Sequence, residues 1–144
     1  MQIGILNGPN LNWLGKREPE LYGHRSWENF QQSLRKEFPA CIISAEQCND
    51  EGALVTLIQD WSLFSDGLII NAGAYTHTSI ALADAVAMIS CPTVEVHLSQ
   101  VTAREGYRHH SYLSPVVKGT ITGLGLEGYR LAVQYLLHFL SHRR

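Results

Sequence analysis

Short apolar runs recur along the chain and alternate with stretches of mixed polarity. The runs are residues 3–6, 41–44, 67–70, 93–98 and 116–123, and they are rich in Ile, Val and Leu. Most have too few polar positions for a strand with one solvated face, which is typical of strands buried on both faces of a parallel sheet. The pattern therefore predicts five strands, most of them inside a sheet.

Helical patterns lie between the apolar runs. Ser26 is a candidate N-cap for a helix whose apolar residues recur three and four positions apart, and a similar pattern follows Asn49. Residues 79–90 are rich in alanine and stop before Pro92, while residues 126–144 end with cations, which the helix dipole favours there. The hydroxyl side chains expected to cap the third helix are Thr76, Thr78 and Ser79.

Strand and helix alternate through the chain, with no internal repeat or low-complexity linker. Parallel strands joined by right-handed helical crossovers place helices on both faces of the sheet. We therefore predict a single α/β domain over residues 1–144, with a flavodoxin-like, doubly wound, five-stranded parallel sheet. In such sheets the functional site lies outside the carboxyl ends of the strands, where the strand order reverses.

Composition narrows the class of protein. The 144 residues carry a net charge of −2 with both signs mixed along the chain, so no nucleic-acid partner is expected. No apolar run approaches about 18 residues, and the chain opens on a strand, so neither a membrane span nor secretion is expected. Cys41, Cys48 and Cys91 lack metal-ligand spacing and predict free thiols, the first and last of them buried. We expect a cytoplasmic protein.

Polar side chains concentrate in the segments that follow the first, third and fourth strands. Because the carboxyl ends of parallel strands meet at one edge of the sheet, these segments are expected to form one site. The polar residues are Asn7, Asn10, Asn12, Arg17 and Tyr22 in the first segment, Asn71 and His77 in the second, and Glu95, His97, Ser99, Arg104, Arg108, His109 and His110 at and beyond the end of the fourth strand.

Glu95, His97 and Ser99 alternate along the fourth strand, which places them on the same side. A carboxylate beside an imidazole fixes the tautomer of the ring and stabilises its charged form, leaving the second ring nitrogen for general acid or base catalysis. The alternative is the polar end of an exposed strand. The nearby Arg108 and His77 favour the catalytic interpretation.

Residues 7–23 hold neither helical nor strand periodicity, and a loop of this length is typical of a binding loop, a lid or a disordered linker. It contains no phosphate-binding motif, and Pro9 removes one amide group that a phosphate would need. A nearby guanidinium, such as that of Arg17, favours the phenolate form of a tyrosine, so Tyr22 is a candidate general base. An aromatic anchor that holds the loop down is an equal alternative for Tyr22.

The adjacent His109 and His110 could ligate a metal only together with His77 or His97, and no cysteine or carboxylate stands at a familiar metal spacing. We therefore expect no metal, and interpret the two histidines as structural hydrogen-bonding groups or subunit contacts. Arg108 is interpreted as a clamp for a carboxylate or hydroxyl, because a guanidinium presents a planar fork of donors.

Four long motifs resemble one enzyme family over nearly the whole chain. They are "NGPNLNWLGKREPELYG", "NAGAYTHTSIALADA", "VEVHLS" and "YRHHSYLSPVVKGTITGLGLEGYRLA". The motifs are similar to those of type II 3-dehydroquinate dehydratase, the cofactor-free enzyme of the shikimate and quinate pathways. The resemblance implies reversible dehydration of 3-dehydroquinate to 3-dehydroshikimate, no cofactor, and a homododecamer built as a tetramer of trimers.

The resemblance also implies roles for individual residues. Tyr22 is the base, kept as a phenolate by Arg17 and by an aspartate of a neighbouring subunit, and Asn10 holds a water that stabilises the enolate. His97, oriented by Glu95, protonates the departing hydroxyl. The residues implied for substrate binding and subunit contact are Asn71, His77, Asp84 as the neighbouring subunit's aspartate, Ser99, Arg108 and the backbone near Leu98.

The sequence departs from the family pattern at Ala83, Gln100, Thr102 and Gly106, which affects subunit contacts and the surroundings of the site. Two other functions remain open. A non-catalytic flavodoxin-like module for flavin or nucleotide would need a phosphate-binding loop after the first strand, which this chain lacks. A scaffold that assembles without activity is separated from an enzyme only by an assay.

Overall fold

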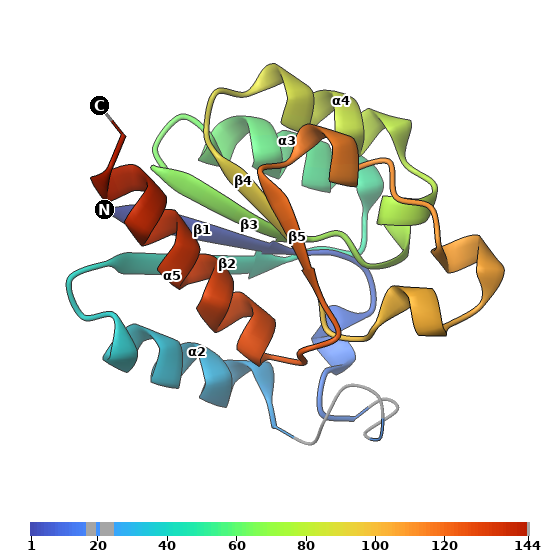
Figure 1. The fold of residues 1–144 in the computed structure, drawn as a ribbon, viewed down its shortest axis with the longest axis horizontal. Helices are drawn as coiled ribbons and strands as arrows, with labels where there is room; N and C mark the ends of the chain where they lie inside the picture. The colour runs from blue at the N-terminus through green and yellow to red at the C-terminus, as the bar shows by residue number, and fades with distance from the viewer. Residues whose placement is uncertain (17–19, 21–24, 144) are drawn as a thin grey trace.

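The strands form one parallel sheet. The computed structural model describes residues 1–16, 20 and 25–143, and the strand order is β2-β1-β3-β4-β5, with every neighbouring pair parallel (Figure 1). The order reverses between β1 and β3, so the expected functional edge lies where these two strands end. The strands are β1 Gln2–Asn7, β2 Ile42–Gln47, β3 Gly67–Asn71, β4 Thr93–His97 and β5 Gly119–Thr122.

Helices cover both faces of the sheet, which confirms the predicted doubly wound fold. Helices α2 (Trp27–Glu37) and α5 (Glu127–Ser141) pack on one face, and α3 (Glu51–Trp61) and α4 (Ile80–Met88) on the other, so each face has its own apolar core (Figure 1). Short 3₁₀ helices shape the connections: η1 Leu11–Trp13, η2 Gly73–His77, η3 Val101–Ala103, η4 Gly106–Arg108 and η5 Ser114–Val116.

Burial separates the central strands from the edge strands. All residues of β3 and β4 are buried, and β1 is buried from its second residue onward, as predicted from their apolar runs. The edge strands β2 and β5 are partly exposed. Two predicted boundaries were wrong: β2 continues to Gln47, because an edge strand tolerates polar residues, and β5 starts only at Gly119, because η5 occupies the start of the predicted run.

Side-chain caps begin three of the helices. The hydroxyl of Ser26 accepts a hydrogen bond from the backbone N–H of Asn29 at 3.2 Å, and that of Ser79 accepts from the N–H of Leu82 at 3.0 Å, so both predicted caps are confirmed. Helix α3, expected after Asn49, is capped by Asp50.

The cysteines are free, as predicted, but only Cys41 is buried. Cys91 is half-buried just before β4, and its thiol donates to the carbonyl of Ser65 at 3.3 Å. Burial raises the pKa of the Cys91 thiol to about 11, so it stays protonated at neutral pH. In the part of the chain that the structure describes, no helix combines the length and the apolar character needed to cross a membrane.

The ends of β1 and β3 lie in close contact through a glycine. The backbone N–H of Gly8 donates to the carbonyl of Asn71 at 2.7 Å, and a Cβ at Gly8 would lie 2.5 Å from the carbonyl oxygen of Ala72. Any side chain would therefore push the two backbones apart. This contact holds the loops that follow β1 and β3 side by side, which brings their polar side chains together.

We expect Gly8→Ala to lower the free energy of unfolding by about 1–3 kcal/mol, because the added methyl group meets backbone atoms that cannot rotate away. The matched control is Gly119→Ala, since nothing lies within 4 Å of a Cβ at that position. Denaturant unfolding of both variants measures the difference. Equal stability of the two would show that the backbones near Gly8 move apart easily.

Candidate active site

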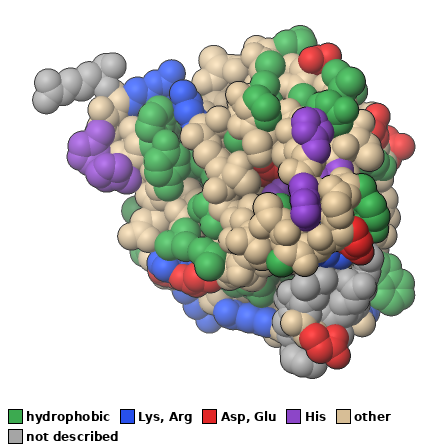
Figure 2. Space-filling view, turned by 45° about the vertical axis from the view of Figure 1, so that its right-hand side comes forward, with side chains coloured by type: hydrophobic (Ala, Val, Ile, Leu, Met, Phe, Trp, Pro, Cys, Tyr) green, Lys and Arg blue, Asp and Glu red, His purple; other side chains and the backbone are tan. Residues whose placement is uncertain are grey.

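A cleft of about 150 Å³ opens at the carboxyl ends of β1, β3 and β4. On the face shown in Figure 2, histidine side chains lie in two separate places, one at the left edge and one near the middle. Seven of the predicted site residues line this cleft, which confirms that the three segments meet: Asn10, Asn71, His77, His97, Leu98, Ser99 and Arg108. Apolar walls come from residues that sequence analysis did not select, including Trp13 and Leu14 from the first loop and Val101 from η3.

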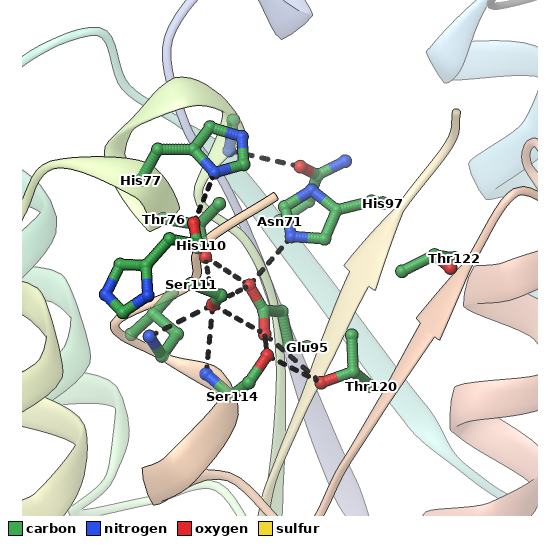
Figure 3. Close-up of polar contacts among 12 residues, drawn as sticks. Asn71, Thr76, His77, Glu95, His97, His110, Ser111, Ser114, Thr120 and Thr122 are labelled. Atoms are coloured by element: carbon green, nitrogen blue, oxygen red, sulfur yellow. Dashed lines mark hydrogen bonds and ion pairs between the residues drawn. The ribbon is translucent and has the colours of Figure 1, made fainter. Parts of the chain in front are cut away.

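The predicted pairing of Glu95 and His97 is confirmed. Nε2 of His97 lies 2.7 Å from Oε1 of Glu95, and the two side chains point toward each other from β4 (Figure 3). Since a carboxylate only accepts, Nε2 carries the proton and Nδ1 is left for a ligand. Burial favours a raised pKa for Glu95, but the hydrogen bond and charge of His97, with bonds from Thr76 and Ser114, outweigh it and hold that pKa below its usual value.

Four hydroxyl groups surround Glu95, and we call them the hydroxyl cage: Thr76, Ser111, Ser114 and Thr120 (Figure 3). The interpretation of Thr76 as a helix cap was wrong. Thr76 is a residue of η2, and its hydroxyl donates to Glu95. A buried carboxylate without donors is costly, whereas helix α4 is already capped by Ser79. Sequence analysis missed the other three residues, since isolated serine and threonine side chains give no signal of a shared partner.

His77 is held beside His97. Its Nδ1 lies 2.7 Å from the carbonyl of His110, so Nδ1 is the protonated nitrogen, and its ring stacks on that of His97 with centroids 6.3 Å apart. Burial lowers the pKa of His77; the hydrogen bond to His110 opposes this shift, and the positive charges of His97 and Arg108 lower the pKa further. Neutral His77 therefore offers Nε2 to the cleft as a hydrogen-bond acceptor.

Asn71 is fixed by a buried network that reaches the last helix. Its Nδ2 donates to the hydroxyl of Tyr129 at 2.9 Å, and that hydroxyl donates to Oδ1 of Asn7 at 2.7 Å. The backbone N–H of Gly73 donates to Oδ1 of Asn71 at 3.1 Å. Full burial raises the pKa of Tyr129 far above its usual value, so its hydroxyl remains a donor.

Asn10 has an unusual backbone. It is exposed at the mouth of the cleft with φ of 71°, in the left-handed region, and its N–H donates to Oδ1 of Asn49 at 3.1 Å. Asparagine tolerates this conformation better than most residues. The backbone turn therefore directs Asn10 to the cleft without a glycine.

Two arginines supply positive charge to the cleft. Nε of Arg108 donates to Oε2 of Glu105 at 2.7 Å; burial alone would lower the pKa of Arg108, but Glu105 raises it, so the guanidinium stays charged. Arg104, predicted among the converging polar residues without a specific role, also lines the cleft and donates from Nη1 to the hydroxyl of Ser99 at 3.4 Å. Its position between two cleft residues in the sequence was the available signal.

The remaining predicted residues either do not line the cleft or lie outside the described part of the chain. Arg17 and Tyr22 lie outside the described residues, so their positions stay predictions. Asp84 is exposed on α4 and does not line the cleft. Nε2 of His109 contacts the carbonyl of Arg104 at 3.0 Å, which agrees with a structural role. Among the described residues, no group of three or more Cys, His, Asp or Glu is placed to hold a metal.

Fold and cleft define an α/β protein with a histidine–carboxylate pair at the carboxyl edge of a doubly wound sheet, an arrangement suited to acid–base catalysis. The chain belongs to the class II dehydroquinase family, whose model matches residues 1–137. It is 53% identical over 135 residues to the 3-dehydroquinate dehydratase of Dinoroseobacter shibae, and the match covers 92% of this chain and 90% of that protein. It is 48% identical over 143 residues to the 3-dehydroquinate dehydratase of Trichodesmium erythraeum, and that match covers 98% of this chain and 95% of the relative. The crystal structure of type II dehydroquinase from Butyrivibrio crossotus superposes with a TM-score of 0.91 at 41% identity, covering 95% of this chain and 97% of that one.

We expect Tyr129→Phe to lower the free energy of unfolding by about 1–3 kcal/mol, because the amides of Asn7 and Asn71 both lose a buried partner. The matched control is Tyr135→Phe, which removes an exposed hydroxyl from the same helix and should change stability by less than about 0.5 kcal/mol. Thermal and denaturant unfolding measure both. Stability in Tyr129→Phe equal to that of the control would mean that water replaces the lost hydroxyl.

Proposed function

We propose that the protein dehydrates 3-dehydroquinate to 3-dehydroshikimate, as a hydro-lyase that works without a cofactor. The family and the names of the relatives support this substrate. The observation that carries the proposal is the buried Glu95–His97 pair in a cleft that also offers two guanidinium groups, because the substrate combines a carboxylate with several hydroxyls. Shikimate biosynthesis is the proposed route, with quinate catabolism as the alternative use of the same step.

The chemistry divides into two proton transfers. A base removes the proton alpha to the ketone, and the C–H electrons move into the carbonyl to form an enolate. The enolate then returns its electrons to form the C=C bond of the enone, while the C1 hydroxyl leaves with a proton from a general acid as water. The base ends protonated and the acid deprotonated, so exchange with solvent restores both. Each transfer by a positioned group contributes about 10²- to 10⁴-fold to the rate.

The first transfer is assigned to Tyr22. Its phenolate form would be favoured by Arg17 and by the neighbouring subunit's aspartate, since positive charge and hydrogen bonds stabilise a phenolate. A lid formed by the first loop would exclude water when it closes. Asn10, at the mouth of the cleft, would hold the water that donates to the enolate oxygen.

The second transfer is assigned to His97. Its Nε2–H is engaged by Glu95, so the proton for the leaving hydroxyl comes from Nδ1 of the imidazolium. Glu95 stabilises that positive charge and fixes the ring, while the hydroxyl cage keeps Glu95 charged. The carboxylate thus acts through the histidine without contacting the substrate.

Substrate binding is assigned to the remaining cleft residues. Arg108 would bind the substrate carboxylate, while neutral His77 would accept a hydrogen bond from a substrate hydroxyl through Nε2. Asn71 and Ser99, with the backbone near Leu98, would complete the set. Both Asn71 and His77 are already held by hydrogen bonds on their far sides, so little ordering is needed on binding.

We propose that the chain assembles as a homododecamer, a tetramer of trimers, in the cytoplasm. Helix α4 supports this assignment because it exposes Ile80 and Met88 at 59% and 76%, which an assembled neighbour would cover. Asp84 lies exposed on the same helix, where it could reach the site of a neighbouring subunit. The site is then complete only in the assembly.

The purified protein, mixed with 3-dehydroquinate, should give the ultraviolet absorbance of the conjugated enone product, with turnover that survives both borohydride and a chelator.

We expect Tyr22→Phe to reduce kcat by about 10²- to 10⁴-fold while KM stays near that of the wild type, because only the base is lost. Tyr135→Phe, which removes a hydroxyl far from the cleft wall, should keep full activity. Near-normal turnover in Tyr22→Phe would remove Tyr22 from the mechanism.

Arg17→Ala should also lose rate with little loss of stability, since its proposed partner is the phenolate. Circular dichroism and size measurements on the same sample show whether the variant is folded and assembled. A wild-type protein that is folded and assembled yet inactive would contradict the proposed reaction and favour a scaffold.

A further inference from the structure

Glu95 has no exposed surface, and its two carboxylate oxygens are surrounded by donors. Oε1 accepts from Thr76 and from Nε2 of His97, and Oε2 accepts from Ser114 at 3.0 Å and from Thr120 at 3.2 Å (Figure 3). A carboxylate has about four lone-pair sites, so these four donors fill it. The carboxylate has no vacant site for a proton of its own.

Ser111 lies beside this set, and its hydroxyl group must act as a donor. Its Oγ accepts from the backbone N–H of Leu113 at 3.2 Å and from that of Ser114 at 3.0 Å. These two bonds use both lone pairs of the hydroxyl, so its single proton must be donated. The shortest remaining contact is Oγ1 of Thr76 at 2.7 Å, while the oxygens of Glu95 lie at 3.2 and 3.4 Å.

Because Thr76 donates its only hydroxyl hydrogen to Glu95, its Oγ1 accepts the hydrogen bond from Ser111. The result is a directed chain of hydrogen bonds that begins at two backbone N–H groups and ends on Oε1 of the carboxylate. Backbone N–H groups cannot accept, so the chain cannot reverse. Protonation of Glu95 would require one of its four donors to give up its hydrogen bond to the carboxylate.

We propose that Ser111 and Thr76 are positioning residues of the active site, which hold Glu95 as a permanent acceptor so that His97 keeps its proton on Nε2 and exchanges only the one on Nδ1. The inference rests on the proposed function for its catalytic meaning, but the hydrogen-bond chain exists without substrate. Glu95 then does not relay protons. Each turnover must return a proton to Nδ1 from the cleft side.

The charged and titratable groups near Glu95 are consistent with this assignment. His97 faces it from the same strand, His77 lies beyond His97 on η2, and Arg108 lies on the cleft side. The groups that face Glu95 from Ser111, from η5 and from β5 are neutral hydroxyls. No described carboxylate competes for the donors, because those hydroxyls bond to Glu95 and to one another.

The test compares four variants by NMR of the unliganded protein. ¹⁵N shifts of His97 report which ring nitrogen carries the proton, and the ¹³C shift of the Glu95 carboxyl reports its ionisation as pH falls. In Thr76→Val and Ser111→Ala we expect a mixed His97 tautomer and a Glu95 titration moved to higher pH, because a donor to the charged form is lost. Thr76→Ser, which keeps the hydroxyl, should restore wild-type behaviour. Thr122→Val is the matched control: it makes the same substitution as Thr76→Val, but the hydroxyl of Thr122 donates to Gln100.

Kinetics supply a second readout. Thr76→Val should lower kcat about tenfold with KM within about twofold, and should move the acid limb of the pH profile to higher pH, whereas Thr76→Ser and Thr122→Val should match the wild type. Unchanged NMR signals of Glu95 and His97 in folded Thr76→Val and Ser111→Ala would overturn the inference whatever the activity. Altered NMR signals in these variants would support it, while an inactive wild type would reject only the proposed reaction.

Discussion

Burial of the Glu95 carboxylate is the constraint on which the rest of the site depends. A charged group with no exposed surface costs several kcal/mol unless donors replace the lost water. Here the donors come from β4, η2, η5 and β5, so four parts of the chain must meet around one side chain. One of these parts, η2, also carries His77, and β4 carries His97. The hydrogen bonds that a buried carboxylate requires therefore also place these histidines at the cleft.

A second polar contact joins the last helix to the switch point of the sheet. Asn7 and Asn71 stand opposite each other in the register of β1 and β3, and both amides are buried. Tyr129 satisfies both with one hydroxyl. Helix α5, which is described over its whole length, gives no side chain to the cleft wall, yet it fixes Asn71 from behind. Packing of the last helix and geometry of the site are thus coupled.

Sequence patterns predicted the features that depend on local periodicity. The central strands were clear because both faces are apolar, and alternation alone placed Glu95 beside His97. Sequence analysis missed the polar end of β2, because these residues form a strand through their pairing with β1 and carry no apolar pattern of their own. The hydroxyl cage was missed because its members are scattered over separate segments, and serine and threonine are more often caps, as the wrong interpretation of Thr76 shows. The roles of Arg17 and Tyr22 stay predictions.

The left-handed backbone of Asn10 limits how this position can vary. Most residues other than glycine lose about 1–2 kcal/mol in this region, whereas asparagine and glycine visit it readily. An alanine here would combine conformational strain with loss of the amide group, and the two effects could not be separated. Glycine would remove the amide and leave the turn intact. Substitution at this position is therefore restricted chiefly to glycine, asparagine and aspartate, and among these only asparagine combines the turn with an amide that both donates and accepts.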